Sequence, residues 1–160
     1  MSAPPTLQLA LEFTLARERY ALPLTAVQEV HEIALLKRVP KAPPVIAGLL
    51  DVRGRVVTLF ELLRVFDLEG DEDGPAVALI LAPPDGHIGL LVRSRPRVTR
   101  LDLSAAEPAE GLIESVLPAC DKLYNIISPR RILEYCEKQV LDVFKLAGAE
   151  NRPATPGRQA

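Results

Sequence analysis

The side chains best suited to metal binding or acid–base chemistry are few and far apart in this 160-residue chain. The soft metal ligands are His31, His87, Cys120 and Cys136. Protein metal sites usually contain at least one closely spaced ligand pair, and these four residues offer none. We therefore expect no metal site. A catalytic site assembled in space around His31 or His87 stays open as an alternative function.

The motifs that mark common active sites are absent from the sequence. The chain contains no GxxxxGK[ST] phosphate loop, no GxGxxG, no HExxH and no GxSxG. Asp71, Glu72 and Asp73 form a carboxylate run, but runs of this kind in glycine-flanked loops are usually solvated. We therefore predict that the protein is not an enzyme and uses no cofactor.

Four arginines lie close together, with no acidic residue among them: Arg93, Arg95, Arg97 and Arg100. On an extended segment the first three would share one face, although Pro96 interrupts the ladder. The cluster fits a solvated edge strand that its charge protects from aggregation. It also fits a second interface, in which a small β-barrel binds an acidic protein, an anionic ligand or nucleic acid. Nucleic acid is the least favoured of these, because no aromatic residues stand between the arginines to stack on bases.

Composition limits the class of protein further. Hydrophobic residues make up 48% of the chain and aromatic residues only 4%, so a core would consist of Val, Leu, Ile and Ala. The formal charge of −2 does not indicate binding to nucleic acid or to an acidic membrane. The longest apolar stretch, Ala76–Ala82, is much shorter than the roughly 20 residues of a membrane helix. We expect a cytoplasmic protein without direct membrane contact, and the absence of a CxxC motif agrees with this.

Apolar residues alternate with other residues over 7–15, which predicts a half-buried strand. A turn at 17–19 and a returning strand over 20–24 follow, whereas Thr25–Val30 fits either a helical turn or a strand. Arg53 and Gly54 separate two β-rich runs, and Gly54 can adopt the positive φ that a tight hairpin needs.

Further strands are predicted over 76–82, 88–92, 98–101, 112–117 and 123–127. We expect short helices over Phe60–Phe66 and at Ser104–Glu107, where the spacing is that of a capping box. Ser128 and Pro129 predict the start of a longer helix, and Gly148 its end. Many short strands with frequent turn signals favour a barrel or a sandwich.

Several stretches follow one another along the chain in an order that is specific when taken together: Phe13–Leu15, Tyr20–Leu24, Val27–Val30, Pro43–Gly48 and the Arg53-Gly54 hairpin. In this order and spacing they resemble the CheW family of chemotaxis coupling proteins, over about Leu9–Leu133. The resemblance implies an all-β fold of two small five-stranded SH3-like β-barrel lobes, packed together across a hydrophobic seam, with a C-terminal α-helix. It implies a single CheW-like domain over residues 7–148, with two interleaved lobes divided near 70–75, and a disordered tail over 149–160.

The same resemblance implies a non-catalytic adaptor of a bacterial chemosensory array. Such a protein binds the cytoplasmic tip of a methyl-accepting chemoreceptor and couples it to a CheA-type histidine kinase or another coupling protein. Partners would recruit it to membrane or cytoplasmic receptor arrays. By position, Glu29 and Arg53 match a charged pair near the receptor-facing surface, although a simple solvated ion pair would look the same. The residues expected to line or support the apolar surface, or simply to pack in the core, are Val27, Val45, Ile46, Leu49 and Val56.

The chain departs from the family pattern at several positions. Thr58 replaces a proline, Glu61 replaces an aspartate, and Arg93 stands where an acid is usual. The connector Asp102–Glu110 is also short, where typical members carry a longer one with an extra strand. The chain is thus similar to divergent accessory coupling proteins of gliding bacteria, the FrzB type, and we expect its kinase contacts to be weakened or lost.

Overall fold

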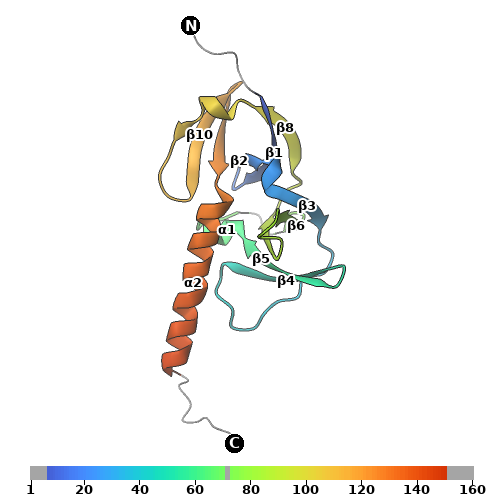
Figure 1. Ribbon diagram of the computed structural model, residues 1–160, viewed down its shortest axis with the longest axis vertical. Coiled ribbons are helices and arrows are strands. Elements are labelled where there is room, and N and C mark those ends of the chain that lie inside the picture. The colour runs from blue at the N-terminus through green and yellow to red at the C-terminus, as the bar shows by residue number, and fades with distance from the viewer. Residues whose placement is uncertain (1–6, 71–72, 151–160) are drawn as a thin grey trace, which may run out of the picture.

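The computed structural model describes residues 7–70 and 73–150, with side chains up to residue 141, and shows two β-sheets and a long C-terminal helix (Figure 1). The first sheet has the order β8-β1-β2-β11-β10-β9. Its strands are β1 (Gln8–Leu15), β2 (Glu18–Pro23), β8 (Arg97–Leu101), β9 (Glu107–Pro108), β10 (Ile113–Ala119) and β11 (Lys122–Ile127). The second sheet has the order β3-β6-β7-β5-β4. Its strands are β3 (Val27–Glu32), β4 (Ile46–Val52), β5 (Arg55–Glu61), β6 (Val77–Leu81) and β7 (Ile88–Val92).

The second sheet closes on itself through the segment that follows β3. Lys37 pairs with Leu49 of β4, with backbone N–O distances of 3.2 and 2.7 Å. Gly48 makes this approach possible, because a Cβ atom there would lie 2.5 Å from the carbonyl oxygen of Lys37. Since β3 and β4 are the two ends of the sheet order, this bridge turns the sheet into a small barrel.

Three apolar clusters fill the molecule, because successive side chains of a strand point to opposite faces. On β6, for example, Leu79 faces the seam between the sheets, whereas Ile80 faces the interior of its own barrel. The seam is the largest cluster, and α2 (Pro129–Glu150) covers it with Ile132, Leu133 and Cys136. The sequence prediction of an all-β fold with two packed lobes and a C-terminal helix is confirmed.

Three hairpins turn through pairs of residues with positive φ, as the type I′ turn requires. The predicted turn at Arg53 (φ 53°) and Gly54 (φ 83°) connects β4 to β5. The other two turns contain no glycine and connect β1 to β2 and β10 to β11. Their central residues are Ala16, Arg17, Cys120 and Asp121.

The helix predictions are correct in part. Ser128 Oγ accepts a hydrogen bond from the Arg131 amide at 3.3 Å and Pro129 begins α2, but the helix continues past Gly148 to Glu150. The short helix predicted over Phe60–Phe66 shrinks to α1 (Leu62–Val65), because Phe60 and Glu61 remain paired with β7. The ambiguous segment 25–30 contains both predicted forms, the end of η1 (Leu24–Ala26) followed by β3.

The connector before β9 differs from its prediction. Asp102, not Ser104, caps the single turn η2 (Leu103–Ala105), because its carboxylate accepts a hydrogen bond from the Ser104 amide at 3.2 Å. The two-residue strand β9 follows and pairs only with Ser115 and Val116 of β10. The short connector therefore still supplies a minimal strand to the first sheet.

The predicted divide near residues 70–75 does not separate the two lobes. The strands on both sides of it, β5 and β6, belong to the same sheet. The chain changes sheet between β2 and β3 and again between β7 and β8, so the lobes are interleaved by a nested insertion. The single-domain extent of 7–148 stays a prediction. The predicted tail over 149–160 begins inside α2, and residues 151–160 lie outside the described part.

Neither α-helix in the described part of the chain has the length and hydropathy needed to cross a bilayer.

Candidate functional site

The structure brings Glu29 and Arg53 together, although they lie 24 residues apart in the sequence. Glu29 stands on β3 and Arg53 at the tip of the β4–β5 hairpin. Arg53 Nη1 donates to Glu29 Oε1 at 3.0 Å. The Glu29 side chain is only 20% exposed, whereas that of Arg53 is 79% exposed. The carboxylate is therefore held in place, while most of the guanidinium faces outward.

The hairpin tip is itself fixed by local hydrogen bonding. The Gly54 amide donates to Asp51 Oδ1 at 2.8 Å. Arg53 and Gly54 are consecutive residues with positive φ. This turn holds the backbone of Arg53 in one conformation and directs its side chain toward β3.

His31 contacts the second oxygen of the same carboxylate, Glu29 Oε2, through Nε2. An ionised carboxylate is only an acceptor, so Nε2 of His31 carries the hydrogen. This hydrogen bond lowers the pKa of Glu29, partial burial opposes the effect, and the positive charges of Arg53 and Arg55 lower the pKa further. His31 was not predicted as part of this site, although its position two residues after Glu29 on a strand predicts a shared face.

The five predicted apolar site residues have very different exposure. Val45 is only 5% exposed and belongs to the seam cluster, against which Val27 and Ile46 also pack. Leu49 is half-buried on β4, and Val56 is 60% exposed on β5. Val56 is therefore open to solvent, Leu49, Val27 and Ile46 are half-buried, and Val45 lies in the core.

A set of exposed apolar side chains on three strands was not predicted from the sequence, and we call it the apolar strip: Leu9 on β1, Val30 on β3 and Val98 on β8. Their exposed fractions are 48%, 47% and 58%. A hollow that includes Pro23 and Leu24 adjoins Leu9. The period-two pattern around Leu9 was visible in the sequence, but its exposure was not, because that depends on where the seam between the sheets ends.

An ion pair connects the strands that carry this strip. Arg95 Nε donates to Glu32 Oε1 at 2.8 Å, which joins the segment entering β8 to the end of β3. Val30 lies two residues before Glu32, and Glu29 one residue before Val30. The apolar strip and the Glu29–Arg53 pair therefore meet at β3, where Val30 and Glu29 point to opposite faces of the strand.

Although no acidic residue lies among the four arginines in the sequence, the fold places carboxylates from other strands beside three of them. Arg93 binds Glu61 of β5 at 2.7 Å, Arg95 binds Glu32 of β3 at 2.8 Å, and Arg97 approaches Glu12 of β1 at 3.4 Å. Among the described residues, only Arg100 of the four makes no ion pair. A second interface through these arginines would have to compete with three internal carboxylates.

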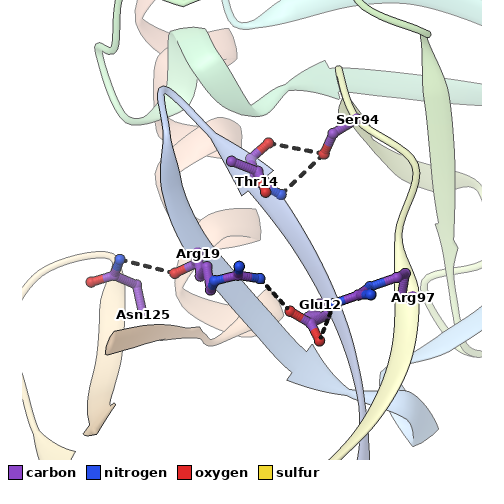
Figure 2. A network of polar contacts seen from close by, with 6 residues as sticks. All are labelled: Glu12, Thr14, Arg19, Ser94, Arg97 and Asn125. Atoms are coloured by element: carbon purple, nitrogen blue, oxygen red, sulfur yellow. Dashed lines mark hydrogen bonds and ion pairs between the residues drawn. The ribbon is translucent and has the colours of Figure 1, made fainter. Parts of the chain in front are cut away.

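Figure 2 shows that Glu12 lies at the centre of a polar network in the first sheet. Its carboxylate is nearly buried and accepts from Arg19 of β2 at 3.1 Å and from Arg97 of β8 at 3.4 Å. Asn125 of β11 donates to the Arg19 carbonyl at 3.1 Å. The network joins four strands, and two guanidinium groups share the Glu12 carboxylate, so the network stabilises the sheet and leaves no free carboxylate there.

The remaining candidate ligands do not form a site. The described residues contain no group of three or more His, Cys, Asp and Glu side chains placed to hold a metal ion. Cys136 is fully buried on α2, and burial, with a smaller contribution from Glu137, raises the pKa of its thiol to about 12. Cys120 and His87 are exposed residues of two separate turns.

Comparisons with known proteins agree with one another. A family model of the CheW-like domain matches residues 9–137. The chain is 27% identical over 131 residues to the chemotaxis protein CheW of Bacillus subtilis (strain 168), and the match covers 76% of this chain and 84% of that protein. The structure is similar to that of the scaffolding protein TtCheW from Thermoanaerobacter tengcongensis, with a TM-score of 0.70 and 23% sequence identity. That likeness covers 79% of this chain and 87% of the solved chain, and it concerns the fold.

Proposed function

The chain belongs to the CheW family, and we propose that it binds the cytoplasmic tip of a methyl-accepting chemoreceptor through the Glu29–Arg53 pair and the apolar strip. As a family member it is a non-catalytic scaffold of bacterial chemotaxis. We further propose that it works in the cytoplasm, where partners recruit it to receptor arrays.

The observation that carries this proposal is the ion pair of Glu29 with Arg53, because Glu29 stands next to the exposed Val30 on β3. An amphipathic helix can place apolar residues on Leu9, Val30 and Val98, in the helix-in-groove mode of recognition. Arg53 has five N–H donors and uses Nη1 on Glu29, so it retains donors for a carboxylate of the partner. The apolar contacts would supply most of the affinity, and the arginine would set the register.

The kinase-facing part of the function is a separate proposal. The short connector contributes only η2 and the two-residue strand β9 to the first sheet. Because contacts that a longer connector could make are absent, we expect a CheA-type kinase or a second coupling protein to bind weakly. This would place the chain among accessory coupling proteins of the FrzB type.

The test measures the affinity of the full chain for a receptor cytoplasmic fragment. Arg53→Asn is the sharpest variant, because asparagine tolerates the positive φ of the turn but removes the charge. We expect a loss of about tenfold, the value of one charge-assisted hydrogen bond, and a larger loss for Arg53→Glu.

Arg17→Asn is the matched control, since Arg17 also has positive φ (71°) at the tip of a two-residue hairpin. Equal affinity of the wild type, Arg53→Asn and Arg53→Glu would refute the role of the ion pair. Offering the regulatory domain of a CheA kinase in a parallel measurement tests the kinase proposal independently.

A further inference from the structure

A groove of about 500 Å³ lies beside α2, and its lining includes neither the Glu29–Arg53 pair nor the apolar strip. One wall is the first turns of the helix, and the other is the turn that connects β6 to β7. Its apolar floor contains Ala26, Leu81 and Leu133.

The floor of the groove opens onto the seam between the two sheets. Leu81 and Leu133 are members of the seam cluster and are 2% and 8% exposed, and Ala26 packs against the same cluster. An apolar side chain that entered the groove would therefore contact well-packed core residues, which is the environment that makes insertion favourable.

The rim of the groove is acidic. It carries Asp85 from the β6–β7 turn and Glu134 and Glu137 from α2. Among the described residues that line the groove, the single cation is Arg130, which is 89% exposed and pairs with Glu134 at 3.4 Å. Three carboxylates and one guanidinium leave a net charge of −2 around an apolar floor.

We propose that this groove binds a short cationic segment of a partner protein, in which an apolar side chain is flanked by Lys or Arg. The apolar side chain would enter the floor, and the cations would lie on the carboxylates of the rim. Residues 129–137 of the helix span about 12 Å, which matches roughly four extended residues. The negative rim repels phosphates, so this charge pattern disfavours nucleic acid and anionic lipid surfaces.

The experiment uses the isotope-labelled full chain and, as a probe, the peptide acetyl-Gly-Arg-Leu-Arg-Arg-Leu-Arg-Gly-amide. Amide chemical shifts are mapped by NMR at low and at physiological salt. We expect the perturbed amides to concentrate in 81–86 and 129–138, with an affinity that falls as salt rises. A peptide with serine in place of both leucines should bind at least tenfold more weakly.

Two variants make the result specific. The double variant Glu134→Gln and Glu137→Gln should lower the affinity for the peptide at least fivefold. Ala82→Arg should also lower this affinity, because it places a positive charge and a large side chain inside the groove. The matched control is Glu107→Gln with Glu114→Gln, since these glutamates are exposed on β9 and β10, away from the groove.

Perturbations scattered over the acidic surface, equal binding of the serine peptide, or unchanged affinity in both groove variants would each overturn the proposal. Dispersed amide spectra of each variant verify that it is folded. Since no receptor fragment takes part, the outcome is independent of the receptor-binding proposal.

Discussion

The guanidinium of Arg93 lies 2.7 Å from the carboxylate of Glu61, and the two side chains are only 17% and 6% exposed. Arg93 also donates from Nε to the same oxygen at 3.0 Å. Both residues are departures from the family pattern, which we found separately in the sequence. The structure shows that they form one unit, since an acid at position 93 would face Glu61 across neighbouring strands.

Arg93→Ala removes two charge-assisted hydrogen bonds from a nearly buried carboxylate. We therefore predict that it lowers the free energy of unfolding by about 1.5–3 kcal/mol. Arg95→Ala is the control, because the Arg95–Glu32 pair is 74% and 63% exposed, and its loss should cost less than about 1 kcal/mol. Urea denaturation measures both values, and equal costs for the two variants would contradict the assignment.

The arginine cluster shows what the sequence could not predict. The carboxylates that pair with Arg93, Arg95 and Arg97 lie 32, 63 and 85 residues away. Periodicity within a segment places residues on a face, but it contains no information about which distant strand lies opposite. The Glu29–Arg53 pair was predicted only because the resemblance to a family supplied that long-range relationship.

The sequence predicted correctly the features whose geometry depends only on neighbouring residues. The hairpin at Arg53-Gly54 and the start of α2 at Ser128 and Pro129 follow from backbone preferences within a few residues. The exposure of Leu9 and Val98 could not be predicted from local backbone preferences, because it depends on where one sheet ends against the other.

The pKa of Glu29 gives a prediction about pH. His31, Arg53 and Arg55 hold this pKa below its ordinary value, despite some opposition from burial. A carboxyl group with a lowered pKa in the folded state stabilises the fold above its unfolded-state pKa, and this contribution is lost as pH falls through the folded-state pKa. A carboxyl ¹³C titration should therefore show a low midpoint for Glu29, and His31→Leu should raise it. The same midpoint in both proteins would show that His31 does not act on Glu29.

The β4–β5 turn should depend strongly on its glycine. Gly54 has φ 83°, which costs a residue with a Cβ atom about 1–2 kcal/mol. We predict a loss of that size in thermal or urea unfolding for Gly54→Ala, although no atom would crowd the new methyl group. Gly86→Ala is a suitable comparison, because its new Cβ would meet only the ends of two side chains at 3.4 Å and a carbonyl at 3.7 Å. A smaller loss for Gly54→Ala than for Gly86→Ala would rule out backbone strain as the cause.

Arg131 holds the loop that follows β9. Its Nη1 lies 3.2, 3.1 and 3.2 Å from the carbonyl oxygens of Ala109, Gly111 and Ile113. Arg131→Ala should remove charge-assisted hydrogen bonds with a net value of about 1.5–3 kcal/mol. Hydrogen exchange should accelerate at the Ala109 amide, which bonds to the Glu114 carbonyl at 2.9 Å. Arg130→Ala is an adjacent control on an exposed side chain, and equal acceleration in both variants would refute the role of Arg131.

The two cysteines should differ sharply in their reactivity. Cys120 is exposed at the tip of the β10–β11 hairpin, whereas Cys136 is fully buried in the seam cluster. Thiolates are the reactive species, and burial raises the pKa of the Cys136 thiol to about 12, so little thiolate forms at pH 8. We expect a disulfide reagent to modify one thiol of the native protein quickly and the second only after denaturation. In Cys120→Ser the fast reaction should disappear, and Cys136 should then react at the rate at which the seam opens. Fast labelling of that variant under native conditions would mean that α2 does not seal the seam.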